Sequence, residues 1–247
     1  LLIIAMALIL PLSAWSKTDT APVRALAGRI LGKDADRFDF RIKESKGADR
    51  FTLSSEDSAI VVEANGINAL CAGLNYYLKN YAGTSVSWYL HEPVHKPASW
   101  PMIPEKITVE ARVPERFFLN YCTFGYTTPY WNEQQWERLI DWMALNGINM
   151  PLAITGQEAV WHKVWQDLGM TDDEIRSYFT GPAHLPWQRM CNLDRWQGPL
   201  PTEWLDNQKE LQKFIVDRER ELGMKPVLPA FGGHIPARLK ELYPDIE

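Results

Sequence analysis

The chain has 247 residues, of which 46% are hydrophobic and 12% aromatic, enough to bury one large core or one smaller and one larger domain. Its net charge is −5 and no run of Lys or Arg is long enough to follow a phosphate backbone, so nucleic acid is not an expected partner and an uncharged substrate fits better. Eight of the eleven tryptophans lie between Trp131 and Trp204, where aromatic faces serve equally for stacking on sugars and for core packing.

Cysteine and histidine usage argues against a metal centre. The three cysteines, Cys71, Cys122 and Cys191, cannot all be paired, so at least one thiol is expected to be free. None of them stands at ligand spacing from another Cys or His, and the five histidines form no H-E-x-x-H pattern. The sequence therefore predicts no bound metal.

The first residues, LLIIAMALILPLSAWSK, form an apolar run followed by the small-x-small triplet Ala14-Trp15-Ser16. This is typical of the h-region and cleavage site of a secretory signal peptide, and the run is too short for a membrane span. Residues 1–16 are therefore expected to be a signal peptide whose charged n-region is missing, and the mature protein is expected to have no membrane segment. The absence of any N-x-S/T sequon favours a periplasmic or secreted bacterial protein over a lysosomal one.

Residues 17–90 are predicted to form a small α/β domain with a mostly antiparallel sheet. Its elements are expected at Ala21–Leu31 (helix), at 37–42, 49–55 and 58–64 (strands), and at Gly66–Tyr81 (helix). The second helix has an apolar stripe formed by Leu70, Leu74, Tyr77, Leu78 and Tyr81. Four prolines between His91 and Lys106 then mark residues 91–111 as a linker.

From residue 112 to 247 the pattern changes to strands that alternate with helices. Strands are predicted at Phe117–Thr123, Asn149–Ile154 and Pro226–Phe231. Between the first two, a helix is expected to begin after Asn132 as its N-cap and to end at Gly147.

The unit MALNGINMPLAITG recurs in form as RELGMKPVLPAFGG, with a helix end, a glycine, an apolar strand and a further glycine. Repeated units of this kind predict a parallel sheet covered by helices, either a barrel or a doubly wound fold. No G-x-G-x-x-G follows a strand, which disfavours a dinucleotide fold. Because a (β/α)8 barrel needs about 250 residues, residues 112–247 are expected to be the first three βα units of a TIM barrel, and the chain the front portion of a longer protein.

Active sites of such barrels lie at the carboxyl ends of the strands. The candidates there are Asn120, Cys122 and Tyr126 after the first strand, Gly156, Gln157 and Glu158 after the second, and Gly232, Gly233 and His234 after the third. Glu158 suggests a general-acid role, since paired carboxyl groups carry out glycoside hydrolysis. However, Thr155-x-x-Glu158 also fits a capping box, as does Thr171-x-x-Glu174, and we expect Glu158 to cap a helix that Thr155 opens.

Cys122 has three interpretations: a pocket-lining thiol, a core residue, or the nucleophile of a Cys–His hydrolase with His234 as its base. The segment FTGPAHLPWQRMCNLDRWQGPLPTEW, between the second and third strands, is long and rich in Pro, Gly and Trp, which is typical of a functional loop. Trp187 and Trp196 are its candidates for stacking on a sugar, the alternative being that each fixes the loop to the barrel rim.

Four blocks in the right order resemble the α-N-acetylglucosaminidase family, glycoside hydrolase family 89: RFFLNYCTFGY, IDWMALNGINMPLAITGQEAVW, FTGPAHLPWQRMCNLDRWQGPLP and GMKPVLPAFGGHIP. The segment GINALCAGLNYYLKNYAGTSVSW is similar to the small N-terminal domain of that family. The resemblance implies a retaining exo-hydrolase that removes terminal α-linked N-acetylglucosamine with two glutamates on a (β/α)8 barrel and no cofactor. Both glutamates would come from later strands, so this chain is expected to hold no catalytic residue and to be inactive alone.

The same resemblance implies sugar-binding roles for four residues. Asn120, Cys122 and Tyr126 match first-strand positions that contact the sugar, and Trp187 matches a loop tryptophan that closes the pocket. An amide and a phenol hydrogen-bond sugar hydroxyls, while a thiol is small and weakly polar. The alternative functions are a non-catalytic sugar-binding protein with the same pocket floor, and the Cys–His hydrolase.

Overall fold

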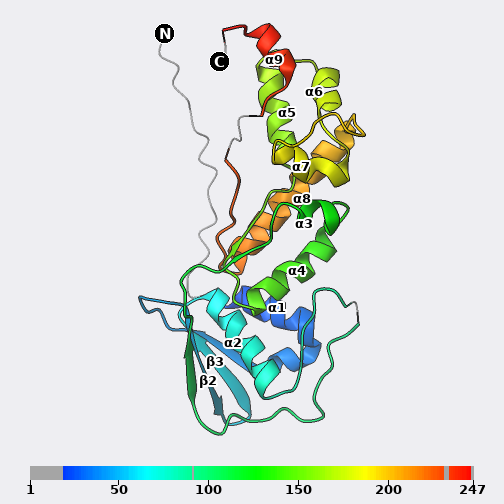
Figure 1. Ribbon diagram of the computed structural model, residues 1–247. Helices are drawn as coiled ribbons and strands as arrows, with labels where there is room; N and C mark the ends of the chain where they lie inside the picture. The colour runs from blue at the N-terminus through cyan, green and yellow to red at the C-terminus, as the bar shows by residue number, and fades with distance from the viewer. Residues whose placement is uncertain (1–18, 91, 231–233, 246–247) are drawn as a thin grey trace.

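The computed structural model describes residues 19–90, 92–230 and 234–245 (Figure 1). The expected signal peptide, residues 1–16, lies outside the described residues, as do Phe231, Gly232 and Gly233. A small sheet with its helices forms one end of the molecule, and a series of helices extends away from it (Figure 1). No helix within the described ranges is both long and apolar enough to cross a membrane.

The N-terminal domain is a four-stranded sheet covered by helices. It consists of α1 (Ala21–Leu31), β1 (Phe38–Ile42), β2 (Arg50–Glu56), β3 (Ala59–Ala64), α2 (Ile67–Asn80) and β4 (Ile107–Glu110). The strand order is β1-β3-β2-β4, with β1 parallel to β3 and the other two pairings antiparallel, which confirms the mostly antiparallel sheet. Strand β4 falls within residues 91–111, so the last part of the predicted linker is an edge strand of this sheet.

Helix α2 packs on this sheet through the predicted stripe. Leu70, Leu74, Tyr77 and Leu78 are fully buried, and the half-buried Tyr81 stacks on Tyr77 with ring centroids 5.7 Å apart. The approach of helix to sheet is closest at Gly73, where an added Cβ would lie 2.7 Å from Val62 Cγ1. The absence of a side chain at residue 73 therefore sets the distance between the two layers.

The second part of the chain begins with short parallel strands. It contains β5 (Phe117–Phe118), α3 (Thr123–Tyr126), α4 (Glu133–Leu145), β6 (Met150–Pro151) and α5 (Gln157–Asp167). Strand β5 is parallel to β6, and Leu152 forms a further parallel bridge with Val227. The parallel order of the three predicted strands is confirmed, but each paired stretch is shorter than predicted. Leu119 ends β5 because its φ of 74° is incompatible with a strand.

Helix α4 has the predicted start and the predicted buried face. The Asn132 side chain accepts a hydrogen bond from the Gln135 N–H, and the Gln135 side chain accepts one from the Asn132 N–H, each at 3.0 Å. The face is formed by Trp136, Leu139, Ile140, Met143 and Ala144, all of them buried. A capping box and one apolar stripe are local signals, which explains why this helix could be predicted accurately.

Helix α5 and the long segment after it share a second hydrophobic core. Its helices are α6 (Asp172–Tyr178), α7 (Leu185–Arg189), α8 (Thr202–Glu221) and α9 (Ala237–Leu242). The second core is formed by Trp165, Met170, Ile175, Tyr178, Phe179, Leu185, Leu200, Leu205 and Leu239. Trp187 is therefore carried by a packed helical unit rather than by an irregular loop.

Polar contacts join the two domains. Asn68 and Asn75 of α2 donate from Nδ2 to the carbonyls of Ile148 and Leu145, each at 2.8 Å. Arg29 of α1 pairs with the buried Asp141 of α4 at 2.6 Å. Because these bonds satisfy buried groups on both sides of the junction, they fix the N-terminal domain against the first barrel units.

Replacing Gly73 by Ala tests the contact between α2 and the sheet. The new methyl group would collide with Val62 and Phe51, so we expect the free energy of unfolding to fall by about 1–3 kcal/mol. The matched control is Gly28→Ala in α1, where no atom of the described residues lies within 4 Å of the added Cβ and where we expect a gain of about 0.5–1 kcal/mol. Urea unfolding measures both, and equal effects of the two substitutions would refute the close approach at Gly73.

Glu219 gives a pH-dependent prediction. Its side chain is fully buried in the last turn of α8, neither carboxyl oxygen has a hydrogen-bond partner within the described residues, and burial raises its pKa well above the usual 4.5. A carboxyl group whose pKa is raised by folding stabilises the protein below its unfolded pKa and loses that contribution as the pH rises towards its folded pKa.

We therefore expect Glu219→Gln to be nearly neutral at pH 4 and to raise the free energy of unfolding by about 1–3 kcal/mol at pH 8. Glu210→Gln, on the exposed face of the same helix, is the control and should show no such pH trend. A gain from Glu219→Gln that is largest at low pH would contradict the burial of an unpaired carboxyl group.

Candidate functional site

The first predicted site residues lie on a tight turn after β5. Leu119 has a φ of 74°, and the Asn120 Oδ1 atom accepts hydrogen bonds from the Thr123 N–H at 3.1 Å and from the Thr123 hydroxyl at 3.3 Å. Cys122 follows as the residue before α3 and is half-buried, with no side-chain capping bond. The strained turn therefore exposes an amide and a thiol at the carboxyl end of a barrel strand.

Tyr126 and Trp187 form an aromatic wall. Their rings meet edge to face with centroids 5.2 Å apart, although the two residues come from α3 and α7. Tyr126 is 79% exposed and Trp187 is half-buried, so the Tyr126 ring faces solvent while one side of the Trp187 ring packs against the protein. Gly125 allows this contact, because a Cβ there would lie 2.5 Å from Trp187 Cζ3.

Asn120 also lines a cavity of about 420 Å³. Trp88 and Trp131 contribute to the same lining, with their ring centroids 5.7 Å apart. Cys122, Tyr126 and Trp187 are not part of this lining. The structure thus brings Tyr126 together with Trp187, and Asn120 together with two further tryptophans, but does not place all four predicted residues in one cavity.

The predicted capping role of Glu158 is wrong. Helix α5 begins after Gly156, whose φ is 70°, and no side chain among the described residues caps it. The capping box predicted for Thr171 and Glu174 is confirmed, with the Thr171 N–H donating to Glu174 at 2.9 Å. Thr155 lies one residue too early to serve as the cap, so Glu158 is released for a different contact.

Glu158 instead forms a buried ion pair with Arg189. Arg189 Nε donates to Glu158 Oε1 and Arg189 Nη2 to Glu158 Oε2, each at 2.7 Å. The side chains are only 2% exposed for Glu158 and 5% for Arg189. A carboxylate enclosed in this way, with both oxygens bonded to a guanidinium group, is not placed to protonate a substrate, which argues against the general-acid interpretation.

The remaining candidates have local contacts. His234 lies with Nδ1 3.4 Å from the Gln188 carbonyl and Nε2 3.8 Å from Asp194, so its polar contacts are with the α7 region rather than with Cys122. This gives the Cys–His hydrolase no geometric support. Cys71 and Cys122 both carry free thiols, as the cysteine count predicted for at least one residue. Trp196 is 57% exposed and touches His184 edge to face.

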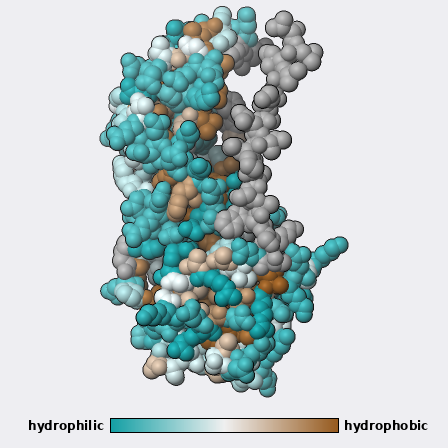
Figure 2. All heavy atoms as spheres, turned by 180° about the vertical axis from the view of Figure 1, so that it is seen from behind, coloured by the Kyte–Doolittle hydropathy of each residue, from teal (hydrophilic) through white to brown (hydrophobic). Residues whose placement is uncertain are grey.

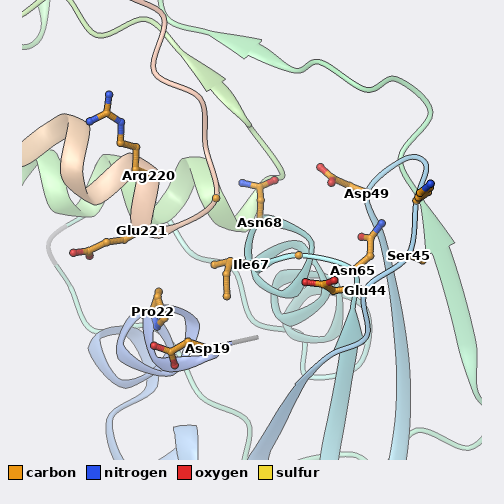
Figure 3. A pocket seen from close by; sticks show the side chains of 13 residues that line it. Asp19, Pro22, Glu44, Ser45, Asp49, Asn65, Ile67, Asn68, Arg220 and Glu221 are labelled. Atoms are coloured by element: carbon orange, nitrogen blue, oxygen red, sulfur yellow. The ribbon is translucent and has the colours of Figure 1, made fainter. Parts of the chain in front are cut away.

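Two larger cavities lie away from Asn120, Cys122, Tyr126 and Trp187, and the predicted candidates Gly156 and Gln157 line the second of them. One of about 720 Å³ is at the domain junction, where Asp49, Asn68 and Arg220 approach from different elements (Figure 3). The other, of about 700 Å³, lies between α5 and α8 and is largely apolar, with Val160, Val164 and Leu228 exposed there. The space-filling view likewise shows hydrophobic patches interrupting the polar surface (Figure 2). Within the described ranges, no cluster of three or more His, Cys, Asp or Glu side chains could hold a metal ion.

Sequence reasoning missed Arg189 and Trp88. The role of Arg189 could have been predicted, because a buried glutamate needs a cationic partner. Arg189 stands two residues after the loop tryptophan Trp187, which the sequence already singled out. Trp88 carries no local signal, since it precedes the predicted linker and meets Asn120 only through the tertiary fold.

A small mixed-sheet domain followed by parallel βα units, with polar and aromatic side chains at the strand ends, defines an α/β protein with a TIM-barrel portion. The α-N-acetylglucosaminidase TIM-barrel domain matches residues 116–247, and the N-terminal domain of the same family matches residues 21–102. The chain therefore belongs to the α-N-acetylglucosaminidase family, as its sequence blocks indicated.

Individual relatives agree with this assignment. The chain is 40% identical to human alpha-N-acetylglucosaminidase over 235 residues, covering 92% of this chain and 31% of the human protein. Two structures of the family 89 glycoside hydrolase from Clostridium perfringens are each 33% identical, with a TM-score of 0.86 over 90% of this chain. One is a complex with its substrate GlcNAc-α-1,4-galactose, and the other contains 2-acetamido-1,2-dideoxynojirmycin. The chain spans about a quarter of the bacterial enzyme.

Proposed function

We propose that the protein containing this sequence is an exo-acting retaining glycoside hydrolase that removes terminal α-linked N-acetylglucosamine. The observation that carries the proposal is the match of both domains to one glycosidase family, together with a relative that binds a GlcNAc-α-1,4-galactose substrate. The edge-to-face pair of the exposed Tyr126 and the half-buried Trp187 supports it, since aromatic faces stack on the apolar side of a sugar ring.

Each site residue has a distinct part in this proposal. Trp187 provides the stacking face. The Tyr126 hydroxyl group and the Asn120 side-chain amide form hydrogen bonds with hydroxyl or acetamido groups of the sugar. Cys122 lines the floor, where a small and weakly polar group lets the ring approach closely. None of these groups transfers a proton in the proposed reaction.

Bond cleavage requires two carboxyl groups about 5–5.5 Å apart, one that protonates the glycosidic oxygen and one that forms the glycosyl-enzyme intermediate. We assign both to later barrel strands, which lie outside residues 1–247. The substrate complex of the C. perfringens relative was obtained with a variant in which two glutamates are replaced by glutamine, which is consistent with such a pair. Hydrolysis at the anomeric carbon needs no cofactor.

The protein expressed from its complete coding sequence is expected to release nitrophenol from the α-linked 4-nitrophenyl N-acetylglucosaminide, and to do so much faster than from the β-anomer. Proton NMR of the early product should show the α-anomer of N-acetylglucosamine, because a retaining enzyme inverts the anomeric carbon twice. Equal or greater activity on the β-linked substrate would refute the proposal. Binding of the sugar without turnover would instead favour the non-catalytic sugar-binding alternative.

Trp187 and Trp196 offer a matched test of the pocket wall. Loss of the Trp187 ring in Trp187→Ala removes the stacking surface, so we expect KM for the α-glycoside to rise about 10-fold or more, equivalent to about 1.4 kcal/mol of binding. Trp196→Ala should change KM less than about 2-fold, because that ring is largely exposed and contacts His184 rather than Tyr126. The reverse order of the two effects would place the sugar elsewhere.

A further inference from the structure

The Glu158–Arg189 pair joins two helices that carry no other charge pair between them within the described residues. Glu158 is in the first turn of α5, and Arg189 is the last residue of α7. Replacing such a pair by apolar side chains of similar volume is often neutral for stability, so stability alone does not explain it. What a bidentate guanidinium–carboxylate contact provides is a fixed direction and distance between the two backbones.

The contact is transmitted directly to the aromatic wall. Arg189 is two residues after Trp187, and the residue between them, Gln188, is fully buried. Gln188 accepts from the Thr180 N–H at 2.8 Å and donates to the Tyr178 carbonyl at 2.9 Å. The backbone that follows Trp187 is therefore held at two successive positions, while the indole itself remains half-buried.

The Trp187 ring is also packed closely against α3, so its position depends on the position of the α7 backbone. An added Cβ at Gly125 would lie 2.5 Å from the indole and 2.8 Å from the Ala183 carbonyl, so α3 leaves no free space there. Beside Arg189, a gap of about 20 Å³ lined also by Phe124 and Thr128 has room for one water at most. A shift of α7 therefore moves the Trp187 ring relative to Tyr126 instead of being absorbed by a void.

We propose that Glu158 and Arg189 are positioning residues: their ion pair clamps α7 to α5 and thereby fixes the Trp187 ring against Tyr126. Both side chains are enclosed, so they act through the Trp187 ring and not on the sugar directly. The consequence of the ion pair for the reaction, a lower KM for the glycoside, rests on the proposed function, whereas its effect on the Trp187 ring does not.

The test uses the protein from its complete coding sequence, labelled with 5-fluorotryptophan, with the Trp187 resonance assigned through Trp187→Phe. Two variants are compared with the unchanged protein. The first carries both Glu158→Leu and Arg189→Met, which removes both charges and keeps apolar volume. The second is Arg189→Lys, which keeps the charge and loses the bidentate contact. Both variants should shift or broaden the Trp187 fluorine signal and leave the signals of Trp88 and Trp100 unchanged. Both should also raise KM about 10-fold while kcat stays within about 2-fold of its original value.

A double-mutant cycle separates positioning from general support of the fold. In a Trp187→Ala background, removal of the pair should raise KM no further, because the ring it positions is gone. The control Asp167→Asn breaks the exposed 3.1 Å pair with Lys163 on the same helix and should alter neither the signal nor KM.

An unchanged Trp187 resonance in both pair variants, or additive effects on KM in the cycle, would overturn the inference. A changed resonance in a protein that neither binds nor cleaves the α-glycoside would uphold the clamp and refute the proposed function. If the double variant unfolds, Arg189→Lys supplies the same comparison with its charge retained.

Discussion

The arrangement of the two domains depends on the contacts of the Arg116 side chain. Its guanidinium group binds the Asp49 carboxylate and the Asn68 amide oxygen of the N-terminal domain, and also the Gly147 carbonyl that precedes β6. The residue stands immediately before β5, and its own carbonyl accepts from the Met150 N–H at 3.2 Å. One side chain therefore ties the small domain, the first barrel strand and the turn before the second strand to a common point.

This constraint makes the N-terminal domain part of the candidate site and not merely a neighbour. The position at which β5 begins decides where Leu119 turns and hence where Asn120 faces. The cavity beside Asn120 is lined in part by Trp88, which belongs to the segment after α2. A barrel strand of two paired residues is too short to hold this geometry by its own ladder, so the junction supplies the rigidity that the strand lacks.

The elements that the sequence predicted well are those with local signals. The helices α1, α2 and α4 have apolar stripes and identifiable ends, and their observed bounds lie close to the predicted ones. The barrel strands were located correctly but predicted too long, and in the first of them periodicity cannot register the left-handed φ of Leu119, which ends β5. In the site, Tyr126 and Trp187 were identified from their places in the sequence and from a family resemblance, but their mutual contact depends on the packing of α3 against α7, which no local pattern encodes.

Glu158 and Glu174 show why an identical motif can have two outcomes. Both follow a threonine by three residues, yet only the second pair forms a capping box. The difference lies in Gly156, where an added Cβ would stand 2.5 Å from the Gln208 carbonyl of α8 and where φ is positive. The approach of α8 forces the chain through a left-handed residue, α5 starts one residue later than the motif requires, and the Glu158 side chain turns inward to Arg189. A tertiary contact made 52 residues downstream of Gly156 thus determines whether a local capping signal is used.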